Sequence, residues 1–254
     1  MQLNLRVSPR LVGIVLGILF VALSLAGGLA MWVAGEAGPG AVRELTRALH
    51  IDREGNLPAL IQSMTLLTCG VLLGLVAAAA RQTRQVGARR WAILSAIFVY
   101  LAIDEGAGIH ELSGLLVDRF IEPQGIFRFS WVVVAILALT IFAIAFTRFT
   151  FRLPPDTRRR FIIAGLIYVG GAVGIEMLAG LYIDATRAWR SPIYYGLTTL
   201  EEALEAAGMT LMLVAVLSHL RDHVELRTLK FAWLGGKSAG VRVSAASEPP
   251  TVVT

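Results

Sequence analysis

The stretch LVGIVLGILFVALSLAGGLAMWVA, from Leu11 to Ala34, decides the fold because 24 consecutive residues carry no charge. An α-helix rises about 1.5 Å per residue, so about 20 apolar residues cross the hydrocarbon core of a bilayer. The whole chain has the same character, with 56% hydrophobic and 16% charged residues and a mean hydropathy of +0.69. The sequence therefore predicts an all-α, polytopic membrane protein.

Five further apolar stretches have a comparable length. We expect six spans near residues 11–34, 57–80, 91–116, 129–147, 161–183 and 197–220. Together they predict a single membrane domain over residues 1–237 and a disordered cytoplasmic tail over residues 238–254. A short interfacial helix is expected near Ala41 to Leu49. Cleavage of the first span near Leu29-Ala30 stays open as an alternative, although signal peptides have shorter apolar runs of about 7 to 15 residues.

The positive charges predict the orientation of these spans. Residues 6–10, 81–90, 148–160 and 221–242 hold sixteen of the 23 arginines and lysines, which places these segments in the cytoplasm. We expect a bacterial inner-membrane protein with both termini inside. The net charge of +5 is then a consequence of topology, so membrane lipid is the expected partner and nucleic acid is not. Whether the protein has protein partners is left open by the sequence. The single cysteine, Cys69, allows neither an intrachain disulfide nor a thiolate metal cluster.

Three of the predicted spans carry acids inside their apolar pattern. At about 1.5 Å per residue, Asp104, Glu105, Glu176 and the acids of residues 201–205 fall roughly 18 to 24 Å above the inner face of the membrane, with His110 nearer the outer interface. The predicted site therefore lies in the outer half of the bundle and opens to the periplasmic side. Its acids and its histidine are Asp104, Glu105, His110 and Glu111 in the third span, Glu176 in the fifth, and Glu201, Glu202 and Glu205 in the sixth.

Helical geometry predicts which of these side chains share a face. Glu201, Glu202 and Glu205 lie within an arc of about 100°. Glu105 and His110 are about 140° apart on a regular helix, and a π-bulge at Gly106 to Gly108 would bring them into line. Separately, the small-xxx-small pattern of Gly170 and Gly174 predicts close packing of the fifth helix against the third or the sixth.

An unpaired carboxylate in hydrocarbon costs about 2.5 to 3.5 kcal/mol, so such groups face a cavity, a partner or a metal. Simpler explanations stay open for each group. Glu201 and Glu202 would also suit a helix N-terminus, and residues 104–111 would suit a helix end in a polar loop. Glu176 would also fit as a neutral acid in the core. Tyr100 and Tyr182 are at the level of the acids and are candidate hydrogen-bond partners.

Three sequence patterns occur together in this chain. They are DExxxxHE over residues 104–111, EExxE over residues 201–205, and Asn56-Leu57-Pro58 at the start of the second span. The combination resembles a group of uncharacterised bacterial multipass membrane proteins. The resemblance covers most of residues 50–215. It implies the membrane architecture and a common site for these acids, and it implies no activity.

These observations favour a divalent metal site. Oxygen ligands with one imidazole suit iron, manganese or zinc. Di-iron bundles and zinc hydrolases usually have more histidine ligands than the one central histidine of this chain. A membrane metalloenzyme is one use of such a site. The expected ligands are Glu105, His110, Glu176, Glu202 and Glu205, with Asp104, Glu111, Glu201, Tyr100 and Tyr182 as additional ligands or their supports.

Two other classes of function are compatible with the same acids. A proton or cation translocator would bind and release ions at them, but the inner halves of the spans have no ionisable residues to continue a path. An accessory subunit of a membrane complex would instead present its acids to a partner protein, and they would then point away from the centre of the bundle.

Overall fold

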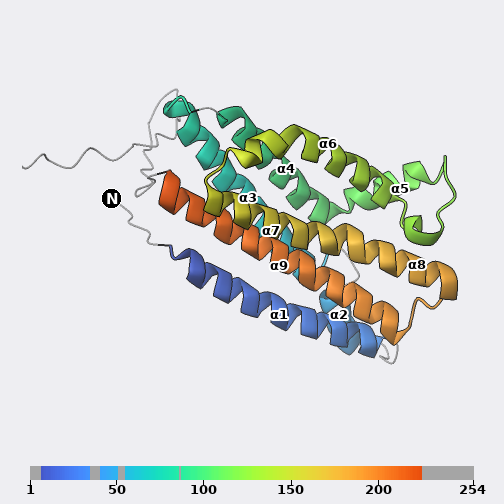
Figure 1. Ribbon diagram of the computed structural model, residues 1–254. Helices are drawn as coiled ribbons and strands as arrows, with labels where there is room; N and C mark the ends of the chain where they lie inside the picture. Colours follow the sequence, from blue (N-terminus) through green and yellow to red (C-terminus); the bar gives the residue numbers. More distant parts are fainter. Residues whose placement is uncertain (1–6, 35–40, 51–54, 86, 225–254) are drawn as a thin grey trace, which may run out of the picture.

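The computed structural model describes residues 7–34, 41–50, 55–85 and 87–224 as a bundle of helices without strands (Figure 1). This confirms the all-α prediction. The predicted tail over residues 238–254 lies outside the described residues. The elements are α1 (Pro9–Ala34), α2 (Ala41–Leu49), α3 (Leu57–Gln82), α4 (Ala88–Ala107), α5 (Ile109–Val117), η1 (Gly125–Phe127), α6 (Trp131–Phe151), α7 (Pro155–Val169), η2 (Gly170–Ile175), α8 (Glu176–Thr186) and α9 (Pro192–His223).

Five of the described helices are long and apolar enough to cross a bilayer, or six when the bent pair α4 and α5 counts as one span. The fifth predicted span is continuous through α7, η2 and α8, over 32 residues. Large apolar side chains on α1 and α6 are exposed, for example Leu25 at 70% and Ile144 at 77%. Apolar faces of this extent on helices of this length are suited to the hydrocarbon of a bilayer. The protein is therefore an integral, multi-pass membrane protein.

Helix α9 has the central place in the bundle. It packs against α1, α3, α7, η2 and α8, whereas α4 packs mainly on α3 and α5 packs on α6. The start of α1 and the end of α9 lie at the same end of the bundle, and α5 and the start of α9 lie toward the other (Figure 1). An even number of crossings gives this arrangement, as the predicted topology requires.

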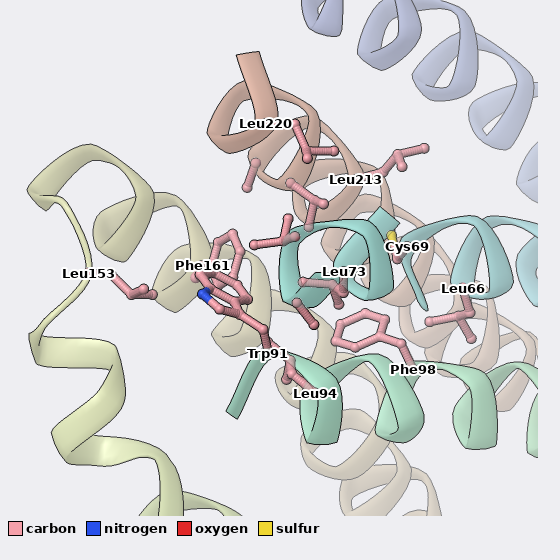
Figure 2. Packing of buried hydrophobic residues seen from close by; sticks show 14 of the residues in the cluster. Leu66, Cys69, Leu73, Trp91, Leu94, Phe98, Leu153, Phe161, Leu213 and Leu220 are labelled. Carbon is pink, nitrogen blue, oxygen red and sulfur yellow. The ribbon is translucent and has the colours of Figure 1, made fainter. Parts of the chain in front are cut away.

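The main apolar core lies between α3, α4, α7 and α9 (Figure 2). Leu73 and Cys69 of α3 are completely buried, at 0% exposed. Trp91 at the start of α4 makes edge-to-face contacts with Phe149 and Phe161, at ring-centroid distances of 5.0 and 5.9 Å. The residues of this core fill the part of the bundle toward the end of α9. The other part holds a smaller apolar cluster of Ala179, Ile183 and Tyr194 together with polar side chains of α4 and α9.

The third predicted span is bent, which corrects the prediction of one helix over residues 91–116 with a π-bulge at residues 106–108. Helix α4 ends at Ala107, and α5 leaves at an angle of 82°. Gly108 joins them with φ 62° and ψ 37°, a left-handed conformation that costs other residues about 1 to 2 kcal/mol. Its amide donates to the carbonyl of Asp104 at 2.8 Å and closes α4. A π-helical turn does occur, but in the fifth span at η2.

Two other local predictions are confirmed. The short helix expected near Ala41 to Leu49 is α2. The Asn56-Leu57-Pro58 sequence opens α3, where the Asn56 side chain accepts a hydrogen bond from the backbone amide of Ala59 at 2.9 Å. An asparagine cap followed by an early proline is a common start signal of helices, which explains why the sequence located this boundary.

Cysteine labelling will test the predicted orientation. Glu122 and Gln82 are exposed at opposite ends of the bundle, and the native Cys69 is buried, so it gives no background. We expect Glu122→Cys to react with a membrane-impermeant maleimide in intact spheroplasts, and Gln82→Cys to react only after lysis. The reverse pattern would contradict the orientation derived from the arginines.

Candidate functional site

The predicted acids of the third, fifth and sixth spans line one cavity of about 340 Å³. Helices α6 and α7 contribute an apolar wall that includes Val134, Leu139 and Val169. Tyr100 also lines the cavity, whereas Tyr182 is not among its lining residues and its hydroxyl instead pairs with Ser191 Oγ at 2.9 Å. The ionisable residues that line it are Asp104, Glu105, His110, Glu111, Glu176, Glu201, Glu202 and Glu205.

Close helix packing brings α9 to the fifth span. A Cβ atom on Gly171 would lie 2.8 Å from the carbonyl oxygen of Glu201, and one on Gly208 would lie 2.6 Å from the backbone nitrogen of Tyr168. Gly170 and Gly174 have no neighbour within 4 Å of such an atom. The predicted packing of the fifth helix against the sixth is thus present, but the glycines responsible are Gly171 and Gly208.

The acids of α9 do not cap a helix. Ser191 caps α9 by accepting a hydrogen bond from the amide of Tyr194 at 3.2 Å. Glu201 therefore lies more than two turns inside the helix. The helix dipole acts within the first turn, so it does not explain why Glu201 and Glu202 are acidic. Glu202 accepts a hydrogen bond from Gln62 Nε2 of α3 at 2.5 Å.

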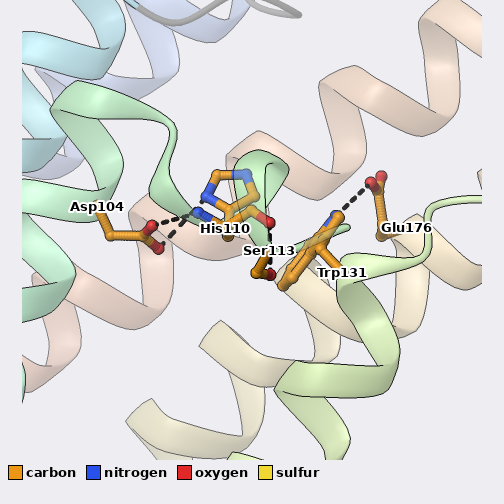
Figure 3. Close-up of polar contacts among 5 residues, drawn as sticks. All are labelled: Asp104, His110, Ser113, Trp131 and Glu176. Carbon is orange, nitrogen blue, oxygen red and sulfur yellow. Dashed lines mark hydrogen bonds and ion pairs between the residues drawn. The ribbon is translucent and has the colours of Figure 1, made fainter. Parts of the chain in front are cut away.

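The bend at Gly108 places His110 against Asp104. One oxygen of the Asp104 carboxylate accepts from the backbone amide of His110 at 2.6 Å, and the other lies 3.3 Å from His110 Nδ1 (Figure 3). Asp104 thus substitutes for the side-chain cap that Gly108 lacks at the start of α5. The pair fixes both the helix start and the ring of the histidine.

Trp131 of α6 connects this pair with the fifth span. Its ring lies 4.8 Å from the His110 ring, centroid to centroid, and its Nε1 donates to Glu176 Oε1 at 3.1 Å (Figure 3). The carboxyl group of Glu176 in turn lies within hydrogen-bonding reach of that of Glu201. Side chains from α4, α5, α6, α8 and α9 therefore form one polar cluster around the cavity.

The negative charge of the cavity has few opposite charges nearby. Seven carboxyl groups and one imidazole line it, and none of the described lining residues is an arginine or a lysine. Arg187 pairs with Asp184 outside the cavity at 3.5 Å. Carboxylates this close repel one another, so protons or a bound cation must offset the charge. Among the described residues, no group of three His, Cys, Asp or Glu side chains has, as it stands, a geometry that could hold a metal ion.

Sequence reasoning missed four polar residues of the site. Gln62 is 3% exposed and holds Glu202, and a lone glutamine within an apolar span is a usable signal for such a role. The indole of Trp131 binds Glu176, although a tryptophan at the start of a span is typical of the aromatic belt. Tyr168 and the buried Thr198 also line the cavity. Both residue types are common in membrane helices, so the sequence has no signal that separates them.

Comparison with known proteins gives a family and no activity. The model of a family described as "Domain of unknown function (DUF8692)" matches residues 13–220. The chain belongs to this family. No curated protein and no solved structure matches the chain. The matched residues include the whole cavity, so the site lies within the part of the chain that defines the family.

A pair of neighbouring glycines tests the packing that forms the cavity. Gly171→Ala places a methyl group against the backbone of α9, and we expect it to lower stability by about 1 to 3 kcal/mol. Gly170→Ala meets open space and should leave stability unchanged or raise it slightly. Thermal unfolding in detergent, followed by circular dichroism, measures both. Equal midpoints for the two variants would contradict the assigned contact.

Proposed function

We propose that this membrane protein binds a divalent metal ion in the carboxylate cavity. The observation that carries the proposal is the meeting of carboxyl groups from α4, α8 and α9 in one cavity without a lining arginine or lysine among the described residues. A divalent cation offsets two negative charges at once, and it removes the repulsion that otherwise opposes this arrangement. The oxygen-rich lining with one imidazole suits iron, manganese or zinc.

The arrangement of Asp104 and His110 supports this assignment. Metal-binding histidines commonly donate one ring N–H to a carboxylate, which orients the other nitrogen toward the metal. Asp104 lies 3.3 Å from Nδ1 of His110, so we assign Nε2 to the metal and Asp104 to its orientation. Gln62 and Trp131 play the same supporting role toward Glu202 and Glu176. The proposed ligands are Glu105, His110, Glu176, Glu202 and Glu205, with Glu201 beside them.

Metal binding requires small rotations of these side chains. Each carboxylate has two oxygens, so a hydrogen bond from Trp131 or Gln62 to one of them is compatible with a metal bond to the other. Glu205 lies one turn after Glu201 on α9 and lines the cavity together with Glu105, Glu202 and Glu176. A metal bound there would polarise a substrate oxygen or a bound water, which is the chemistry of a membrane metalloenzyme.

The same geometry favours a binding site over an ion path. Toward the end of α9, the cavity is followed by the apolar core around Leu73, Phe98 and Leu213. No acid occurs in α9 between Glu205 and Asp222. A proton or cation translocator needs groups that continue across the membrane. With the orientation derived from the arginines, the site opens to the outer side of a bacterial inner membrane.

Elemental analysis of the purified protein tests the proposal. We expect stoichiometric iron, manganese or zinc in the wild-type protein and its loss in Glu176→Gln and Glu205→Gln, because each substitution removes a charged ligand. Glu122→Gln, which alters an exposed acid outside the cavity, is the control and should retain the metal. Folded wild-type protein without metal after expression in metal-supplemented medium would refute the proposal.

Asp104→Asn tests the orienting role of this carboxylate. The amide oxygen of asparagine still accepts from the backbone amide of His110, so α5 keeps its cap, but the charge that holds the imidazole is lost. We expect the affinity for metal to fall about 10- to 100-fold with the stoichiometry unchanged. Metal titration of the demetallated protein measures this, and an unchanged affinity would remove Asp104 from the site.

A further inference from the structure

A second cavity lies at the opposite end of the bundle and has the opposite charge. Its volume is about 550 Å³, and its lining comes from the segment between α3 and α4, the start of α4, the segment between α6 and α7, and the ends of α6 and α9. No acid is among its described lining residues. The polar and aromatic residues that line it are Gln85, Arg89, Arg90, Trp91, Arg148, Phe149, Arg152, His219 and His223.

The four arginines of this cavity have no carboxylate partner among the described residues. The described ion pairs of arginine are those of Arg187 with Asp184 and of Arg221 with Asp222, both outside this cavity. Arg90 is held in place, because its Nη1 donates to the carbonyl of Ala145 at 2.5 Å and its guanidinium lies 5.5 Å from the ring centre of Phe146. Four guanidinium groups without a carboxylate partner among the described residues repel each other around one cavity, and an anion would reduce that repulsion.

Backbone groups at the same cavity also favour an anion. Helix α4 begins there after Gly87, which has no side chain to cap the helix, and the first turn contains no acid. The unpaired amides and the positive end of the dipole of a 20-residue helix are therefore open to a ligand. A helix start combined with arginines is a recurrent arrangement for binding phosphate.

We infer that this cavity binds a phosphate group, and that its source is the headgroup of an anionic phospholipid. The arginines at this end are also explained by membrane topology, because positively charged loops stay in the cytoplasm. Topology alone does not require that the arginines surround a cavity. Arg158, Arg159 and Arg160 belong to the same end and do not line the cavity. The cavity lies where the spans end, at the depth of lipid headgroups, which favours a lipid over a soluble phosphate compound. This inference is independent of the proposed metal site.

The test measures lipid bound to the full-length protein. Wild-type protein is purified from vesicles of equal parts phosphatidylglycerol and phosphatidylcholine, and the lipid that remains bound is identified by native mass spectrometry. We expect enrichment of phosphatidylglycerol in the wild type and a fall of about fivefold for each arginine removed in Arg148→Gln/Arg152→Gln. The control, Arg159→Gln/Arg160→Gln, removes the same charge at the same end and should keep the enrichment. The single variant Arg148→Gln serves if the double variant does not fold.

A second arm distinguishes the two sources of phosphate. Inorganic phosphate is added to delipidated protein, and the midpoint of thermal unfolding is compared with that in an equal ionic strength of chloride. A shift that is lost in Arg148→Gln/Arg152→Gln, without lipid enrichment, would keep the phosphate site and assign it to a soluble ligand. Equal loss of lipid in both double variants, or neither enrichment nor shift in the wild type, would overturn the inference.

Discussion

The repulsion among carboxyl groups within a membrane bundle is the constraint on which the rest of this structure depends. Seven of them line one cavity, where the surrounding helices are apolar and offer little solvation. The fold reduces the cost with single hydrogen bonds from separate helices, from Gln62 to Glu202 and from Trp131 to Glu176. No arginine or lysine is among the described residues that line the cavity, so none of these side chains neutralises the acids. The proposed cation would offset the charge that these hydrogen bonds leave.

The sequence predicted the spans and the level of the acids because both follow from helix rise and hydrophobic length, which are local properties. It could not predict the bend at Gly108. The segment from Gly106 to Gly108 is compatible with a bulge and with a break. The choice between them depends on the Asp104 carboxylate reaching the amide of His110. In the same way, Gly170 and Gly171 differ only in what lies opposite them, and that is a tertiary property.

The apolar core separates the acidic cavity at one end of the bundle from the basic cavity at the other. Trp91, Phe161 and Leu220 belong to this core, so an acidic cavity and a basic cavity are separated by tightly packed side chains. The separation explains why charges of opposite sign within one bundle do not neutralise each other by pairing. The two proposed ligands, a cation in the acidic cavity and an anion in the basic one, would supply the missing opposite charges.

The π-helical turn η2 has a specific consequence for the acidic cavity. A π-turn inserts one extra residue into a helix, and it therefore rotates everything that follows by about 100°. It ends at Ile175, directly before Glu176. Without the extra residue, Glu176 would point about a quarter turn away from its present direction, in which it reaches both Trp131 and Glu201. The π-helical turn thus determines which face of the fifth span carries Glu176, the acid at the centre of that span. The glycines of η2, which weaken a regular helix, are what permits it.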